Sequence, residues 1–240
     1  MNPLDFFRRV QNDIDYALRH DPAARSRTEI FLAYPGLHAL WLHQIAHGLW
    51  ERGHHLSARL LAHTARRRTG VEINPGATIS PGVFIDHGMG VVIGETSVIE
   101  EGCLIYKGVV LGGTSLERKV RHPHLAKNVV VGSNACILGA LHIGEGARIG
   151  SGSVVVRDVA PGATVVGVPG RVARSAKREA FAEQLDHASL PDPVTEIVRG
   201  LAHQNEVLLE RLLQLEKQLG VASTEANRFD PDDLISGRRR

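Results

Sequence analysis

Aliphatic residues recur at every sixth position through most of the stretch from Val71 to Gly170. They are Ile73, Ile79, Ile85, Ile93, Ile99, Ile105, Leu111, Val131, Ile137, Ile143, Ile149 and Val155. A small or apolar residue stands two positions before each of them, and glycine often follows directly. A period of six fits neither an amphipathic helix nor a heptad. It is typical of a parallel β-helix of hexapeptide repeats, in which each repeat supplies one short strand and a turn.

The same pattern predicts how the interior of the β-helix is filled. The aliphatic residue points inward, the small residue fills the gap beside it, and glycine permits the dihedral angles of the turn. The twelve repeats, taken three to a coil, predict about four coils, and one coil cannot bury its own core alone. The predicted β-helix domain covers residues 71–170.

The six-residue register breaks first between Ile85 and Ile93, where the step is eight. Two residues are therefore inserted, around Gly88–Gly90. A β-helix accommodates an insertion by extruding it as a loop, and such loops often carry function. Because Asp86 and His87 stand immediately before this insertion, we expect them to contribute to a site.

The second break lies between Leu111 and Val131, where the step is twenty. We interpret it as one repeat with about fourteen extra residues, from Ser115 to about Asn128. The interpretation places Arg121 and His122–His124 in an extruded loop, so this second insertion also carries ionisable side chains.

The residues before the repeat predict helices. Pro3–His20 has apolar residues at helical spacing, and Pro22 cannot continue that helix. Two further helices are predicted at residues 37–52 and 54–68, and a glycine closes each of them. Residues 1–70 therefore form a predicted N-terminal helical domain.

Beyond the repeat, we predict a short helix over residues 171–187. Apolar positions then alternate at spacings of four and three, which is a heptad pattern. The seam consists of Val194, Val198, Leu201, Asn205, Leu208, Leu212, Leu215 and Leu219. It fits either a single helix lying on its own β-helix or an intersubunit coiled coil, and its narrowness favours the coiled coil. These helices occupy residues 171–220, and the polar tail at 221–240 is expected to be loosely ordered.

Composition narrows the class of protein. The chain has 240 residues and is 43% hydrophobic, which is enough to form a buried hydrophobic core. Its net charge of +2 does not indicate the basic surface that nucleic acid binding requires. No apolar run approaches the ~18 residues of a membrane span, and charged residues interrupt the start where a signal peptide would lie. We therefore expect a cytoplasmic protein with neither nucleic acid nor membrane as a partner.

Most of the other reactive side chains are interpreted as structural. Cys103 occupies a small inward position and Cys136 neighbours an inward isoleucine, so packing explains both better than nucleophilic chemistry. Six further histidines lie in the N-terminal helices without a matching carboxylate pattern, and no metal is expected there. They are His38, His43, His47, His54, His55 and His63.

A histidine beside a β-helix loop suits two kinds of chemistry. One is acyl transfer, in which histidine is the general base for a hydroxyl that attacks a thioester. The other is a metal site shared across a trimer interface, as in γ-class carbonic anhydrases, for which His87, His122 and His124 are the candidates. A non-catalytic trimeric scaffold is a third possibility. The metal site is disfavoured because two of the three histidines fall in the predicted loop rather than in the repeat.

Several motifs together closely resemble serine O-acetyltransferases, over roughly residues 14–172. They are Gly70–Ala77, Asp86–Gly88, Gly90–Thr96, Gly108–Thr114 and Arg121–Pro123, with Asp21–Ala23 and Gly36–Leu40 upstream and Gly167–Gly170 downstream. The resemblance implies a left-handed β-helix that transfers the acetyl group of acetyl-CoA to the hydroxyl of L-serine, the first step of cysteine biosynthesis. The alternative acceptor is another small hydroxyl compound, such as a sugar.

The resemblance also implies a catalytic pair. His87 is the general base that takes the serine hydroxyl proton and later protonates the CoA thiolate. Glu72, where many family members have Asp, orients that imidazole and stabilises its charged form, as the third member of a hydrolytic triad does. A histidine titrates near working pH and so can act as base and then as acid.

The implied binding residues fall into three groups. Asp21 and Asp86 hold the serine ammonium. Arg121 and His122 hold its carboxylate through charge-assisted hydrogen bonds. The acetyl-CoA contacts fall at Gly113, Ser133, Arg148 and Ser151, and no metal is expected.

Departures from the family pattern shape the expected assembly. Gly88–Met89 stands where Ala-Thr is common, and the helical region before the repeat is about half as long as in the longer members, whose extra helices join two trimers. We therefore expect a homotrimer, with a higher assembly possible through the C-terminal helix. The chain ends on Arg240 rather than on the Ile that inserts into O-acetylserine sulfhydrylase, so that complex is doubtful.

Overall fold

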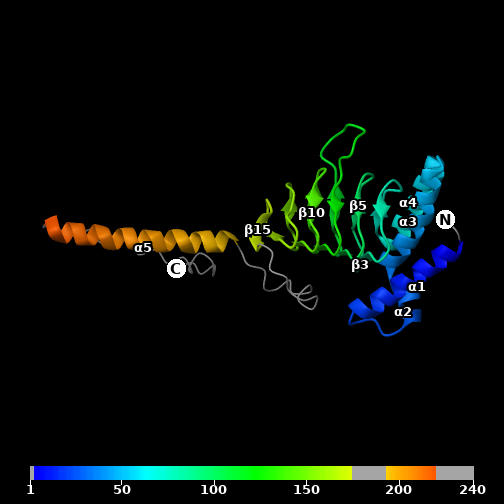
Figure 1. The fold of residues 1–240 in the computed structure, drawn as a ribbon, viewed down its shortest axis with the longest axis horizontal. Helices are drawn as coiled ribbons and strands as arrows, with labels where there is room; N and C mark the ends of the chain where they lie inside the picture. The colour runs from blue at the N-terminus through cyan, green and yellow to red at the C-terminus, as the bar shows by residue number, and fades with distance from the viewer. Residues whose placement is uncertain (1–2, 175–192, 220–240) are drawn as a thin grey trace. The chain divides into compact units, whose positions relative to one another are not determined.

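The computed structural model describes residues 3–174 and 193–219 (Figure 1). Contacts divide the chain into two compact units, Met1–Pro191 and Asp192–Arg240, which are described separately. No helix among the described residues is long and apolar enough to cross a membrane.

Four helices precede the β-helix. They are α1 (Pro3–His20), α2 (Arg27–Ala33), α3 (Pro35–Glu51) and α4 (His55–Thr69). Three of them were predicted, and α4 ends as expected on Gly70, which adopts a left-handed conformation with φ of 74°. The α2 helix was missed because seven residues are too few to show a helical period. Its signal was the N-cap, where the Ser26 hydroxyl accepts a hydrogen bond from the Glu29 backbone N at 3.1 Å.

The strands that follow are mostly two residues long. They are β1 (Glu72–Ile73), β2 (Thr78–Ile79), β3 (Phe84–Ile85), β4 (Val92–Ile93), β5 (Val98–Ile99), β6 (Leu104–Ile105), β7 (Val110–Gly112), β8 (His124–Leu125), β9 (Val130–Val131), β10 (Cys136–Leu138), β11 (His142–Ile143), β12 (Arg148–Ile149), β13 (Val154–Val155), β14 (Thr164–Val166) and β15 (Arg171–Arg174). Successive strands from β1 to β13 belong in turn to the first, second and third of three parallel sheets, as a β-helix requires (Figure 1).

We name the sheets by their order along the coil. Sheet A is β1-β4-β7-β10-β13, sheet B is β2-β5-β8-β11, and sheet C is β3-β6-β9-β12-β14 with β15 at its end. The turns from a sheet C strand to the next sheet A strand form the C–A edge, and those from sheet A to sheet B form the A–B edge. Pairing is parallel and in register from coil to coil, so residues at equal positions of successive coils stack directly.

The core confirms the repeat and corrects its count. All twelve predicted inward side chains are at most 9% exposed, and burial of each contributes ~1.5–3 kcal/mol. Leu125, Val159 and Val165 also point inward and are at most 4% exposed, so the strands complete five coils rather than about four. Because Leu125 continues the repeat, the step from Leu111 is fourteen, and the insertion has eight extra residues rather than about fourteen.

This correction also moves His124. It lies in β8 with its neighbour Leu125, not in an extruded loop as predicted, and its Nε2 pairs with a Glu100 carboxylate oxygen at 2.8 Å. The strand was missed because the eight extra residues separate Leu125 from Leu111, although Leu125 stands six residues before Val131 and keeps the period on that side.

The N-terminal helices pack against the first coil. Phe84, on the outer side of sheet C, is 2% exposed, and its ring lies 6.4 Å from those of Tyr16 and Tyr34. Gly36 comes so close that a Cβ atom there would lie 2.0 Å from the Ile85 carbonyl oxygen. These contacts bring the end of α1 and the start of α3 beside the turn that follows β3.

The region after the β-helix differs from the prediction at its start. Residues 171–174 form β15, antiparallel to β14, so the predicted helix is wrong there, and the rest of that helix lies outside the described residues. In the second unit, α5 (Pro193–Leu219) confirms a helix over the heptad seam. The predicted loose tail at 221–240 also lies outside the described residues.

Candidate active site

The two-residue insertion shapes a turn on the C–A edge of the first coil. Asp86 continues the pairing of β3, because its backbone N donates to the Ile105 carbonyl at 2.9 Å. The chain then reverses through His87, which has a positive φ of 59°, and Gly88, whose N donates to the Asp86 carbonyl at 2.7 Å. The His87 side chain is 71% exposed and is therefore presented to solvent at the rim of the coil.

Two carboxylates meet beside this turn. Asp21, directly after α1, accepts a 2.5 Å hydrogen bond from the Tyr34 hydroxyl on one oxygen and the Ala23 backbone N–H at 2.8 Å on the other. Burial and the nearby charge of Asp21 raise the pKa of Asp86, while His87 opposes the shift. The His87 Nε2 lies 3.8 Å from an Asp86 carboxylate oxygen. Two anionic groups beside an exposed imidazole make a site that attracts a cation.

Two tyrosines belong to this cluster and were missed from the sequence. The Tyr34 hydroxyl donates a hydrogen bond to Asp21. Burial and this hydrogen bond raise the pKa of Tyr34. Tyr106 follows β6 as Asp86 follows β3, so the two are at equal positions of adjacent coils. Burial and the charges of Asp86 and Asp21 raise the pKa of Tyr106. A tyrosine at a turn carries no distinctive spacing, so only its stacking position reveals it.

Glu72 lies at the start of sheet A and has a different partner from the predicted one. Its carboxylate pairs with Arg66 of α4 at 3.0 Å, in a cavity that Met89 and Val91 also line. In the part of the chain that the structure describes, the carboxylate that neighbours His87 is Asp86, and no hydrogen bond joins Glu72 to the imidazole. The role of Glu72 in orienting His87 stays a prediction.

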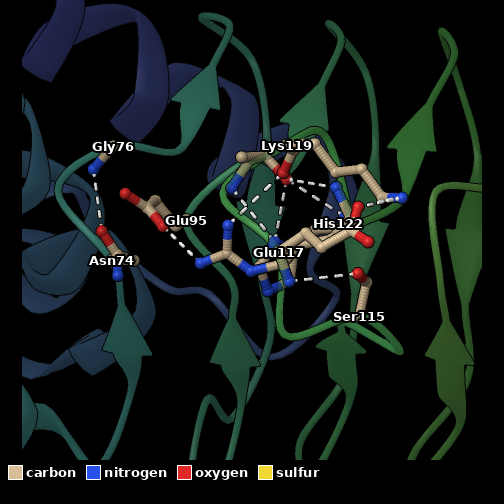
Figure 2. Close-up of polar contacts among 9 residues, drawn as sticks. Asn74, Gly76, Glu95, Ser115, Glu117, Lys119 and His122 are labelled. Carbon is tan, nitrogen blue, oxygen red and sulfur yellow. Dashed lines mark hydrogen bonds and ion pairs between the residues drawn. The ribbon is translucent and has the colours of Figure 1, made fainter.

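A second cluster forms on the A–B edge of the second coil. The Arg121 guanidinium pairs with the Glu95 carboxylate. The Thr96 hydroxyl oxygen accepts hydrogen bonds from the backbone N of Arg121 at 3.0 Å and of His122 at 3.1 Å. Figure 2 shows Glu95, His122 and Lys119 brought together at this edge. Thr96 therefore ties the end of the inserted loop to the turn that follows β4.

The hydrogen bonds of His122 indicate which of its two ring nitrogens carries the proton. Its Nδ1 accepts from the Thr96 backbone N at 3.2 Å, so in the neutral ring the proton is on Nε2. Burial and the charge of Arg121 lower the pKa of His122, which favours this neutral form. A Cβ on Gly94 would lie 1.8 Å from the ring, so only glycine leaves room for it. The result is a neutral donor beside a guanidinium.

Within one chain the two clusters do not meet. His87 belongs to the turn before β4, and Arg121 contacts the turn after β4, so sheet A lies between them. About five residues at ~3.3 Å each separate the edges by on the order of 15 Å. The four predicted serine contacts are thus divided into an acidic pair, Asp21 and Asp86, and a basic pair, Arg121 and His122.

The predicted acetyl-CoA residues are divided in the same way. Ser133 and Ser151 occupy the C–A edge of the third and fourth coils, and the Gly152 backbone N donates to the Ser133 carbonyl at 2.8 Å. Arg148 stands at the start of β12 in sheet C, where it pairs with Val130 of β9, and its charge offsets part of the rise in the pKa of Tyr106. Gly113 lies on the A–B edge, where an added Cβ would be 3.2 Å from the His122 Nε2.

The other reactive side chains have structural surroundings. Cys103 is fully buried, its Sγ donates to the Ala126 carbonyl at 3.1 Å, and burial raises its pKa to about 12, which confirms the packing interpretation. Burial lowers the pKa of His43 to about 3, so this ring is neutral in the folded protein. Among the described residues, no three His, Cys, Asp or Glu side chains are placed to hold a metal ion.

Comparison with known proteins gives a consistent result. No family model matches the chain. It is 46% identical over 211 residues to a serine acetyltransferase of Bacillus subtilis, covering 88% of this chain and 95% of that protein. It is 49% identical over 214 residues to one from Synechococcus elongatus, covering 89% and 84% of the two chains.

Solved structures agree with these relatives. The structure of a Neisseria gonorrhoeae serine acetyltransferase in complex with serine has a TM-score of 0.69 and 38% identity, over 72% of this chain and 70% of that one. A serine acetyltransferase in complex with CoA has a TM-score of 0.67 and 36% identity, over 71% and 70%.

Proposed function

This chain belongs to the serine acetyltransferase family, and from that premise we propose that its two edge clusters bind opposite ends of the serine zwitterion. The enzyme transfers the acetyl group of acetyl-CoA to the hydroxyl of L-serine and forms O-acetyl-L-serine for cysteine biosynthesis. The observation that supports the proposal is charge: one edge presents two carboxylates and the other presents a guanidinium with a neutral histidine donor.

His87 is the general base in this proposal. Its imidazole takes the proton of the serine hydroxyl as the oxygen attacks the thioester carbonyl, and the resulting imidazolium protonates the departing CoA thiolate. The Asp86 carboxylate at 3.8 Å stabilises the imidazolium. Glu72 is proposed to orient the ring, which requires its carboxylate to rotate away from Arg66. No covalent acyl-enzyme is formed, because the acetyl group passes directly from sulfur to the serine oxygen.

The serine ammonium binds between Asp21 and Asp86. Asp21 is fixed by the Tyr34 hydroxyl and the Ala23 backbone N–H, so it is in place before serine arrives. Asp86 is held within the pairing of β3 and carries a raised pKa, because burial disfavours its charge. A bound ammonium relieves this cost by supplying a counter-charge, so the acidic pair selects for an amino group beside the reacting hydroxyl.

The serine carboxylate binds to Arg121 and His122. A guanidinium has five N–H donors in a planar fork, so Arg121 can pair with Glu95 on one side and with a ligand carboxylate on the other. His122 adds a hydrogen bond from its Nε2 proton. Thr96 holds the backbone of both residues and the His122 ring, and Glu95 holds the Arg121 guanidinium, so the two side chains are positioned without the substrate.

A neighbouring copy completes the site. Serine is far smaller than the width of sheet A, so one molecule cannot reach both edges of a single chain. Packing the A–B edge of one copy against the C–A edge of another brings the two clusters together, and closed symmetry yields the homotrimer expected from the sequence. The exposed Leu116 and Val120 of the inserted loop provide apolar contacts for such packing. A higher assembly remains compatible with this trimer.

Acetyl-CoA extends along the C–A edge. Ser133 and Ser151 offer polar contacts along the stacked turns, and Arg148, at the start of β12 in sheet C, supplies a positive charge for a phosphate group. Gly113 of the neighbouring copy leaves room for CoA to approach the backbone. This placement puts the thioester near His87 and the nucleotide toward the later coils.

The location of the protein is part of the proposal as well. A cytoplasmic location agrees with the supply of acetyl-CoA there and with the free thiols of Cys103 and Cys136.

An acceptor screen tests the proposal. Thiol release from acetyl-CoA is measured with L-serine, L-homoserine, serine methyl ester and several sugars as acceptors. We expect L-serine to be preferred, and the methyl ester to react poorly because it cannot bridge to Arg121. Equal rates with serine and its ester would contradict the assignment of Arg121 and His122, and a preference for sugars would contradict the acceptor itself.

A further inference from the structure

The helix α5 presents a stripe of apolar side chains that are exposed in the structure. Its leucines are more than half exposed: Leu201 57%, Leu208 61%, Leu212 51%, Leu215 56% and Leu219 75%. Exposed leucines at regular spacing, unlike leucines scattered singly, indicate an interaction surface. The helix is 27 residues long, which gives room for more than three heptads.

The spacing identifies what kind of surface this is. Assigning Val198, Asn205, Leu212 and Leu219 to a positions places Leu201, Leu208 and Leu215 at d positions. Side chains at a and d pack as knobs into holes of a second helix with the same pattern, and this narrow seam is typical of coiled coils. A partner with the same heptad pattern is most simply another copy of α5.

Two residues specify how the copies pair. Asn205 is the one polar residue in the seam, and a single Asn at an a position selects the register in which it meets its own equivalent. Arg211 occupies a g position and Glu216 occupies the e position five residues later. In a parallel in-register pair, g of one helix faces the following e of the other, so these opposite charges meet. Antiparallel packing brings g against g and loses this pair.

We propose that α5 associates with α5 of other copies of this chain as a parallel, in-register coiled coil. Closed rotational symmetry gives equal segments of each copy the same direction along the axis, which is the arrangement that this pairing needs.

Disulfide trapping in the full-length protein tests the proposal. Leu212→Cys places a thiol at an a position, where equivalent residues of parallel helices come within disulfide range. Glu210→Cys places an equally exposed thiol on the opposite face and is the matched control. Both variants and the unmodified chain, which reports the background from Cys103 and Cys136, are oxidised in a glutathione redox buffer and separated on non-reducing gels.

We expect Leu212→Cys to form covalent dimers at least about tenfold faster than Glu210→Cys, at a rate that does not change on dilution. Equal rates for the two variants, or no dimer from either, would overturn the proposal. Exclusive cross-linking of α5 to another protein or to its own β-helix would overturn it equally. Retained acetyltransferase activity confirms that each variant is folded.

Charge reversal tests the parallel register. In the Leu212→Cys background, Arg211→Glu places like charges against Glu216 and is expected to slow dimer formation several-fold. Adding Glu216→Arg restores opposite charges and recovers the rate. If the single reversal has no effect, or the double reversal slows the reaction further, the helices do not pair in this register.

Discussion

The C–A and A–B edges show two ways in which the same repeat carries functional groups. On the C–A edge, the acidic cluster gathers Asp21, Tyr34 and Asp86 from three segments that are distant in the chain. On the A–B edge, the basic cluster comes from a turn and one inserted loop, joined by Thr96. The first depends on how the helical domain packs against the β-helix, whereas the second is nearly local.

The clusters also differ in how their charges are balanced. Arg121 already pairs with Glu95, so a ligand carboxylate must share the guanidinium. The Asp86 carboxylate has an imidazole nitrogen at 3.8 Å, the His87 backbone N–H as a hydrogen-bond donor and a second carboxylate nearby. Binding of a zwitterion therefore relieves charge repulsion between the two carboxylates on the acidic edge. On the basic edge, it adds a second carboxylate to the existing ion pair of Arg121 and Glu95. We expect the acidic edge to contribute more to selection of the amino group, and the basic edge to fix the orientation.

The largest effect is expected from the base. His87→Ala should lower kcat by ~10²–10⁴-fold, because the variant lacks the imidazole that accepts the hydroxyl proton in the proposed mechanism. The side chain is 71% exposed, so the melting temperature should not change. His63→Ala, which removes a histidine from the nearby cavity of α4 and Glu72, is the control and should retain activity. More than about a tenth of the activity in His87→Ala would contradict the assignment.

The basic edge should respond through substrate affinity instead. Arg121→Ala removes a charge-assisted contact, so KM for serine should rise roughly 10–100-fold while KM for acetyl-CoA stays nearly constant. Arg121→Lys should be a poor substitute because it lacks the planar fork. Parallel kinetics with both substrates decide the point. Equal weakening of serine and acetyl-CoA would instead identify Arg121 as a residue that shapes the loop.

Mixing one variant from each edge tests whether the two edges come from different copies, provided that serine is kept far below the raised KM of Arg121→Ala, where both variants are nearly inactive. Refolding His87→Ala with Arg121→Ala creates interfaces in which an intact C–A edge faces an intact A–B edge. Random assembly of equal amounts makes about a quarter of the sites complete, so activity should rise to roughly a quarter of the unmodified level. Each variant refolded alone is the control. If the mixture is no more active than its parents, the complete site lies within one chain.

A smaller effect should follow from loosening the basic cluster. Thr96→Val keeps the shape of the side chain but removes the oxygen that accepts from the Arg121 and His122 backbone N–H groups. Losing these bonds should raise KM for serine about tenfold, at roughly 0.7 kcal/mol of net contribution for each bond. Thr78→Val, an exposed position of β2, is the matched control and should be silent. An unchanged KM in Thr96→Val would mean that the loop is held by other contacts.

The contrast between the edges also explains what the sequence could reveal. The inward positions and the first insertion follow directly from a strict period, so the β-helix and the turn at His87 were predictable. The strand β8 was missed because the loop before it breaks the period between Leu111 and Leu125, although Leu125 stands six residues before Val131. The helix predicted over residues 171–187 is wrong at residues 171–174. Their sequence alone does not show that the backbone of β15 pairs with β14.

The site was predictable as a set of residues but not as an arrangement. Family motifs identify Asp21, Asp86 and Arg121 one at a time, and they give no information on which edge each occupies. That information comes from the assignment of successive strands to three sheets. This assignment places sheet A between His87 and Arg121. Tyr34 and Tyr106 were missed because their contacts depend on packing and stacking rather than on spacing.

The smallest expected effect concerns stability on the acidic edge. Burial and Asp21 raise the pKa of Asp86 above its unfolded value, so the folded protein holds a proton there that the unfolded chain has already released. Between those two pKa values stability falls as the pH rises, and above the folded pKa the whole cost of the buried charge is present. Asp86→Asn removes this cost. It should therefore raise the melting temperature slightly at pH 7 to 8, although it weakens serine binding, and the gain should vanish below about pH 4, where Asp86 is neutral in both states. Asp15→Asn, which removes a more exposed carboxylate paired with Arg27, is the control and should bring no such gain. Melting curves from pH 4 to pH 8 measure both variants, and a melting temperature for Asp86→Asn that falls equally at every pH would show that the Asp86 charge stabilises the turn.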